Sequence, residues 1–290
     1  MKAYRVAAQA SSGMAALRCE DAYVSLIKRT LERLNTDITR HFADSEDPEP
    51  VHDARVDIRV LTSILYLFYP LFNGSDFESA DEMLKDAISA FGEKREADML
   101  IKSLKDYAEK NPDHKDSAND TIMKIEAGSM SGKEDRELIL KRVKKLGNMV
   151  VSLKLTDEAK DHGNFESFAK LRLSSMIEEL REEAGKSFGK KRSIHKYRIA
   201  VKKALYSLEL AEEERDFGGA VWRARLKAVQ DIAGSIHDAE VNMKLVGDYG
   251  IEDKIFNEGF EDFLEEKISE GRERFMFLMD EIREMETDIG

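Results

Sequence analysis

The sequence is poor in cysteine, proline and glycine. Its 290 residues include one cysteine, Cys19, which excludes an internal disulfide framework and a metal site built from several cysteines. We therefore expect a reducing, cytoplasmic setting. Only four prolines and 17 glycines occur, so few points in the chain force a helix to stop. The chain is instead rich in Glu, Lys, Ala, Leu and Met, which lose little side-chain freedom in a helix, and this composition favours helical structure.

Long hydrophobic runs are also missing. The longest, "ILYLFYPLF" at 64–72, is too short to cross a bilayer, and the segment 1–19 lacks the apolar core of a signal peptide. The chain carries 58 acidic and 46 basic residues, a formal net charge of −12. This balance argues against general nucleic-acid binding, which needs a broad basic face. We expect a soluble protein without a membrane partner, in which a local basic pocket for an anion is still allowed.

The hydrophobic pattern has the period of a helix throughout. Apolar residues recur at steps of three and four, as at Ile27, Leu31, Leu34 and Ile38, and no alternating pattern or hairpin turn predicts a strand. The sequence therefore predicts an all-α fold, with a looser region around 128–135 and a linker at 155–164. We expect helices at about 14–43, 50–70, 75–109, up to about 154, 164–186, 191–214, 218–246 and 254–287.

Two pairs of segments indicate an internal repeat. A shift of 143 residues places His52 on His195, Arg55 on Arg198 and Arg59 on Lys202. A shift of 142 aligns "LKDAISAFGEKREADML" (84–100) with "VQDIAGSIHDAEVNM" (229–243). Two blocks with nearly the same shift predict duplication of a helical unit. We expect two four-helix bundles related by a pseudo-twofold axis, residues 1–155 and 156–290, that together form one domain.

Each histidine segment places basic side chains on one helix face. Positions i, i+3 and i+7 form a single stripe, and the segment "KKRSIHKYRIAVKK" (190–203) has seven Lys or Arg residues and no acid to pair with them. Arginine suits phosphate oxygens because its donors form a planar fork. A single phosphate is more often held by a glycine-rich loop, and no such motif occurs. The stripes therefore favour a chain-like polyanion.

Other interpretations of these residues remain open. His52 and His195 are as well explained by structural hydrogen bonds as by ligand binding, and His237 beside Asp238 is read as an orienting partner or a core contact. The sequence has no metal-ligand spacing and no nucleophile motif, so we predict no catalytic residue, metal site or cofactor. The alternatives are a metal-dependent phosphohydrolase that uses the repeat histidines, and a helical scaffold that docks an acidic partner.

Four ordered segments resemble motifs of the CHAD domain, the conserved histidine α-helical domain. They are "DPEPVHDARVDIRVL", "FGEKREADML", "IHKYRIAVKKALYSLEL" and "VQDIAGSIHDAEV", and the resemblance extends from about residue 15 to 287. It implies paired helical bundles around a basic cavity that binds inorganic polyphosphate. It also implies a binding protein rather than an enzyme, a place on cytoplasmic polyphosphate granules, and a phosphohydrolase of the CYTH type as partner.

The resemblance assigns the binding role to basic residues and histidines of both halves. At Val60, Thr62 and Leu205 this chain departs from the basic residues of the family pattern, which predicts a less basic cavity. The implied polyphosphate-binding residues are His52, Arg55, Arg59 and Arg95 in the first half, His195, Arg198, Lys202 and Lys203 in the second, and Arg29 and Arg172 from the preceding helices.

Overall fold

The computed structural model describes residues 17–43, 49–89, 93–129, 136–157, 163–186, 191–212, 218–249 and 253–286. Within these ranges the chain is helical apart from its connections and one isolated β-bridge, between Arg18 and Asn164, so the all-α class is confirmed. The α-helices are α1 (Cys19–Ala43), α2 (Glu49–Leu67), α3 (Gly74–Ser89), α4 (Glu93–Lys110), α5 (Lys115–Ser129), α6 (Arg136–Ser152), α7 (Phe165–Ala184), α8 (Lys191–Glu212), α9 (Ala220–Tyr249) and α10 (Lys254–Glu284). Two short 3₁₀ helices, η3 (Tyr69–Leu71) and η4 (Pro112–His114), connect α2 to α3 and α4 to α5.

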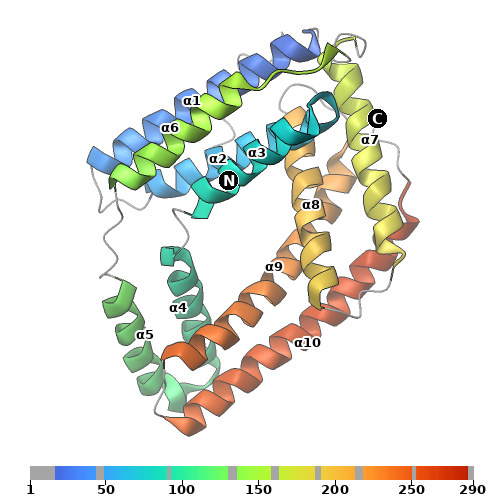
Figure 1. The fold of residues 1–290 in the computed structure, drawn as a ribbon. Coiled ribbons are helices and arrows are strands. Elements are labelled where there is room, and N and C mark those ends of the chain that lie inside the picture. Colours follow the sequence, from blue (N-terminus) through green and yellow to red (C-terminus); the bar gives the residue numbers. More distant parts are fainter. Residues whose placement is uncertain are drawn as a thin grey trace.

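Two helices differ from the sequence-based expectation. The single helix expected at 75–109 is divided into α3 and α4, which point in different directions (Figure 1). The stretch after Lys110, for which no helix was expected, contains α5. Pro112 begins η4 there, and Ala118, Ile122 and Ile125 then give α5 a buried apolar stripe.

The helices enclose two hydrophobic clusters. The larger one is formed by α1, α2, α3, α6, α7 and α8 with parts of α9 and α10, and the smaller one by α4, α5, the end of α9 and the start of α10. The long helices α9 and α10 pack along one another and contribute to both clusters (Figure 1). Each cluster combines residues from both sides of the expected boundary at 155/156. The duplication and this boundary therefore remain predictions.

Close packing in the smaller cluster depends on a glycine of α10. Tyr107 of α4 hydrogen-bonds with Nδ1 of His114 at 2.5 Å, and its ring packs against Phe256 and Phe260. A β-carbon at Gly259 would overlap the Tyr107 hydroxyl. The absence of a side chain at this position therefore lets α4 approach α10.

We expect Gly259→Ala to lower the free energy of unfolding by about 1–3 kcal/mol, because the overlap displaces a buried tyrosine. Urea unfolding followed by circular dichroism measures this change. Tyr107→Phe removes the oxygen that the new methyl group would overlap, so Gly259→Ala should cost less in that background. An equal cost in both backgrounds would show that the overlap is not its cause.

Candidate anion-binding site

A cleft of about 320 Å³ lies where α2, α4, α8, α9 and α10 come together. Figure 1 shows these helices arranged around the centre of the molecule. The cleft is lined by five basic side chains, which come from α2, α4, α8 and α10, and we call it the basic cleft. These side chains are Arg59, Lys102, Arg198, Lys202 and Lys267.

The periodicity of α8 directs two of these cations into the cleft. Tyr197, Val201 and Leu205 lie on the buried face of this helix. Arg198 and Lys202 each follow one of these buried residues, so they lie one turn apart on the face beside the core. The neighbouring face of α9 brings mainly small or uncharged residues to the cleft, among them Gly234, Ser235 and Ala239. The basic groups of α8 therefore meet little steric obstruction from α9.

Three carboxylates also line the basic cleft. Asp106 accepts a hydrogen bond from Lys267 Nζ at 3.4 Å, and Asp231 accepts one from Lys227 at 2.7 Å. Asp238 is the third. The basic side chains outnumber the acidic ones, so the cleft has a positive formal charge inside a protein whose net charge is −12. Such a site attracts a small or linear anion without creating a broad basic surface.

Neutral hydrogen-bonding groups complete the lining. Nε2 of Gln230 donates to the Tyr206 hydroxyl at 3.3 Å, and Oε1 of Gln230 is buried without a hydrogen-bond partner among the described residues. In the same region Nδ2 of Asn242, a buried residue of α9, donates to Ser103 Oγ at 2.7 Å. This bond docks α4 on α9 next to Lys102.

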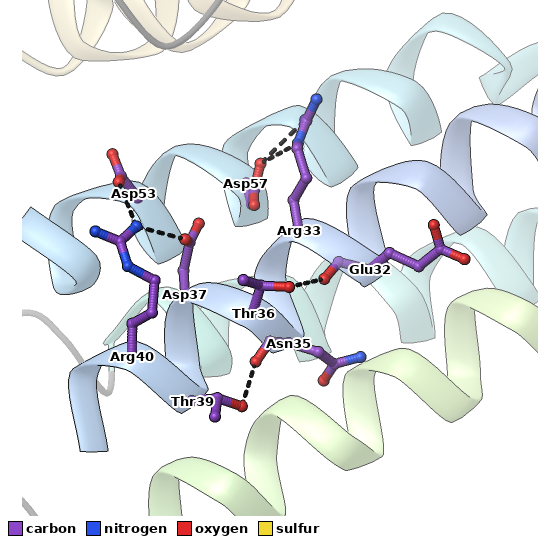
Figure 2. A network of polar contacts seen from close by, with 9 residues as sticks. All are labelled: Glu32, Arg33, Asn35, Thr36, Asp37, Thr39, Arg40, Asp53 and Asp57. Carbon is purple, nitrogen blue, oxygen red and sulfur yellow. Dashed lines mark hydrogen bonds and ion pairs between the residues drawn. The ribbon is translucent and has the colours of Figure 1, made fainter. Parts of the chain in front are cut away.

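Helix α2, which contributes Arg59, is joined to α1 by a polar network (Figure 2). Nε of Arg33 donates to Oδ1 of Asp57 at 3.0 Å, and Arg40 lies 3.4 Å from Asp37 and 3.8 Å from Asp53. Asp57 is only 4% exposed. Burial, and to a smaller extent Asp37, raise the pKa of Asp57 to about 6, although Arg33 acts in the opposite direction.

This raised pKa gives the stability of the fold a defined pH dependence. The folded chain binds the Asp57 proton more tightly than the unfolded chain does, so the stabilisation is fully present below about pH 4 and is lost as the pH rises through about 6. A shift of about two units corresponds to on the order of 3 kcal/mol. We expect Asp57→Asn to flatten the fall in unfolding free energy over this range, as measured by urea denaturation, whereas Asp113→Asn, at an exposed residue, should not. An unchanged slope in Asp57→Asn would contradict the assignment.

The structure brings three predicted site residues together in the basic cleft. Arg59 from the first half of the sequence faces Arg198 and Lys202 from the second. The predicted convergence of the two basic stripes is therefore seen for these three side chains. Val60 and Leu205, two of the positions that depart from the family pattern, are buried in the larger cluster, and the Thr62 hydroxyl donates to the carbonyl oxygen of Ile58.

Two other predicted residues belong to a second basic group, away from the lining of the cleft. The Lys203 ammonium lies 3.7 Å from the ring centroid of Tyr66, and an Nη of Arg172 donates to the Tyr66 carbonyl oxygen at 3.5 Å. The Tyr66 hydroxyl donates to Asp81, which also pairs with Lys85 at 2.6 Å. We call Tyr66, Asp81, Lys85, Arg172 and Lys203 the Tyr66 cluster. Burial lowers the pKa of both Lys203 and Arg172.

The remaining predicted residues have other surroundings. Arg29 and Arg55 are half-buried on α1 and α2 and do not line the basic cleft. His195 is exposed, and its ring lies against that of His237, with 5.2 Å between the centroids. The side chains of His52 and Arg95 lie outside the described part of the chain.

Sequence reasoning missed several residues of the cleft. Lys102 follows Arg95 by seven residues and therefore lies on the same face of α4, so extending the predicted stripe by two turns would have found it. Gln230 and Tyr206 carry no charge and had no comparable signal. Lys267 lies in the acidic stretch "FLEEKISEG" of α10, where nothing in the local pattern marks it.

Two further properties of the described residues bear on other classes of function. No group of three or more His, Cys, Asp or Glu side chains is placed there as ligands of a metal ion would be. In the same ranges, no helix has the length and apolar character needed to cross a membrane.

Comparisons with known proteins agree with the fold and the motifs. A family model, the CHAD domain, matches residues 25–247. Among solved structures, the CHAD domain from the plant Ricinus communis is 17% identical, with a TM-score of 0.74 over 97% of this chain and 96% of that chain. PptA from Streptomyces chartreusis is 10% identical, with a TM-score of 0.66 over 90% of this chain and 99% of that chain. The comparison with curated protein sequences found no match. Because the family model matches more than half of the chain, this protein belongs to the CHAD domain family.

Proposed function

We propose that this protein binds inorganic polyphosphate in the basic cleft and does not hydrolyse it. The observation that carries the proposal is the convergence of Arg59, Arg198 and Lys202 with two further lysines in one cleft. Guanidinium and ammonium groups make charge-assisted hydrogen bonds to phosphate oxygens. Membership of the CHAD family supports the same ligand, because CHAD domains are associated with polyphosphate binding.

The arrangement of the basic groups favours a linear ligand over a single phosphate. Arg59 and Tyr66 are seven residues apart on α2, so they lie on one face about 10 Å apart. Arg59 lines the cleft, and Tyr66 is the centre of the second group, which contains Arg172 and Lys203. A polyphosphate chain that extends from the cleft along α2 would meet further cations at the Tyr66 cluster.

The carboxylates of the cleft set a condition on the ligand. Asp106 already pairs with Lys267, and their separation of 3.4 Å is longer than that of a strong charge-assisted hydrogen bond. A ligand must compete with this carboxylate for the lysine and tolerate Asp231 and Asp238 nearby. A densely charged polyanion can do so because several cations act on it at once. Orthophosphate has no such advantage and should bind far more weakly.

Calorimetric titration of the protein with long-chain polyphosphate tests the proposal. We expect tight binding at low salt that weakens steeply at moderate salt, by analogy with the counterion release seen for nucleic acids. The polyphosphate should be recovered at its original length after incubation with magnesium. Absence of binding at low salt would overturn the proposal, and release of orthophosphate would favour the phosphohydrolase alternative.

The proposed ligand also suggests where the protein acts. Binding of this kind would hold it on polyphosphate granules in the cytoplasm, close to a phosphohydrolase of the CYTH type. A fluorescently tagged chain should then colocalise with the granules. A tagged variant in which the basic side chains of the cleft are replaced should be spread evenly through the cell.

A further inference from the structure

Two histidines meet at the edge of the basic cleft. The rings of His195 on α8 and His237 on α9 have centroids 5.2 Å apart and planes inclined by 42°. His195 is exposed and His237 is half-buried. Arg198 follows His195 by one turn and Asp238 follows His237 directly, and both line the cleft. The histidine pair is thus contiguous with the proposed polyphosphate site, although neither ring forms its lining.

The neighbours of His237 disfavour its charged form. Burial lowers the pKa of His237, the Arg198 guanidinium lowers it further, and the neighbouring His195 ring acts in the same direction. Asp238 and Glu240 on the same helix act in the opposite direction but do not reverse the effect. Glu240 is shared with Arg272 of α10, which lies 3.4 Å away, and α4 presents Met99 and Lys102 to the adjacent part of the cleft. The surroundings of the His237 ring therefore favour its uncharged form.

A phosphate group bound beside the two rings changes which form of the histidine is favoured. Two imidazole rings this close and a guanidinium group one helical turn away can together donate hydrogen bonds to one phosphate group. The negative charge of that group then favours the protonated form of the His237 ring, since an opposite charge nearby stabilises the charged form. The protons come from solvent, so binding takes up protons in the range near neutral pH where histidine titrates.

We propose that His195, His237 and Arg198 form a phosphate subsite at the edge of the basic cleft, and that polyphosphate binding there is coupled to proton uptake by His237. The proposal rests on the proposed polyphosphate-binding function and adds His237 to the binding residues. The affinity of the site for polyphosphate should then increase as the pH falls through the range in which histidine titrates.

Calorimetry with long-chain polyphosphate at fixed ionic strength tests this subsite. Long chains are used because only their terminal phosphates titrate near neutral pH. We expect the wild type to bind between about threefold and tenfold more tightly at pH 5.5 than at pH 7.5, because a rise of up to one pKa unit on one ring yields up to a factor of ten. Any pH dependence that the histidine variants retain is subtracted from this gain. In two buffers of different ionisation enthalpy, the apparent binding enthalpies at pH 6.5 should differ, which reports proton uptake.

The informative variants keep a hydrogen-bond donor but cannot become charged. His237→Asn, and His195→Asn/His237→Asn, should lose the gain at pH 5.5 relative to their own affinity at pH 7.5, whatever that affinity is. His114→Asn removes a histidine that does not line the cleft and pairs with Tyr107 instead, so this variant should keep the full gain. In NMR titrations of the wild type, addition of polyphosphate should raise the pKa of the His237 ring.

The outcomes separate this inference from the proposed function. If the wild type binds no polyphosphate at any pH, the proposed function fails and the subsite fails with it. If the wild type binds and the double variant shows the same pH dependence, only the subsite is overturned. An unchanged His237 titration in the presence of bound polyphosphate would overturn it equally.

Discussion

Replacement of Arg59, Arg198 and Lys202 together by alanine is expected to weaken polyphosphate binding at least about a thousandfold. Hydrogen bonds to charged groups contribute about 1.5–3 kcal/mol each, and each 1.4 kcal/mol corresponds to a factor of about ten in affinity. The loss should exceed that of any single replacement, because the variant leaves Asp231 and Asp238 facing the polyanion with fewer compensating charges.

The same variant should remain folded. The three side chains are half-buried at the cleft and are not part of either hydrophobic cluster. Its circular dichroism spectrum and thermal unfolding should therefore stay close to those of the wild type, and calorimetric titration then reports on binding alone. A change in the unfolding temperature of many degrees would indicate that the cleft also supports the fold.

A charge-matched control decides between a defined site and diffuse attraction. Lys28→Ala/Lys124→Ala/Lys144→Ala removes three exposed charges from α1, α5 and α6, none of which contributes to the cleft. We expect this variant to lose less than about tenfold in affinity, because exposed charges are screened at moderate salt. Equal losses in the two triple variants would mean that net charge controls binding. No loss in the cleft variant would place the site elsewhere.

The largest expected effect on stability comes from Phe68, which directly follows α2. Its side chain is completely buried, and its ring centroid lies 5.4 Å from that of Tyr23, 5.7 Å from that of Phe165 and 5.4 Å from that of Phe168. These contacts join the end of α2 to α1 and α7. Phe68→Ala removes the ring from the centre of this group and leaves a cavity, which we expect to cost about 3–5 kcal/mol of unfolding free energy.

Urea unfolding at constant pH measures this cost. Phe68→Leu, which keeps most of the volume, should cost less than half as much. Phe277→Ala removes the same ring from α10 at a position that is 64% exposed, so its effect should be within about 0.5 kcal/mol. A small effect of Phe68→Ala, similar to that of Phe277→Ala, would contradict the packing described for the larger cluster.

The helical pattern predicted most of the fold because each helix buries one apolar stripe. Helices α2, α8 and α10 begin within one residue of the expected positions. The pattern failed between α3 and α4, where apolar residues continue at helical spacing through the 90–92 segment and no proline marks the break. Local periodicity records which residues are buried, but not whether two successive helices point in the same direction.

The candidate site was predictable to the extent that it lies on repeated helix faces. Arg59, Arg198 and Lys202 were identified from a stripe shared by two segments, and all three line the basic cleft. Lys203, next to Lys202, was assigned to the same cavity, but one residue is a rotation of about 100° around a helix, and its ammonium lies over Tyr66 instead. His237 was interpreted as an orienting partner or a core contact, and the structure shows its half-buried ring beside the ring of His195 on α8.

The sequence by itself determined that the chain is helical, that it belongs to the CHAD family, and that basic residues gather on faces of α2 and α8. These properties depend on the spacing of residue types within one helix. Only the tertiary structure decided that Lys102 and Lys267 complete the basic cleft and that His195 meets His237. Those neighbours are tens to hundreds of residues apart in the sequence, and their proximity follows from how α4, α9 and α10 pack across one another.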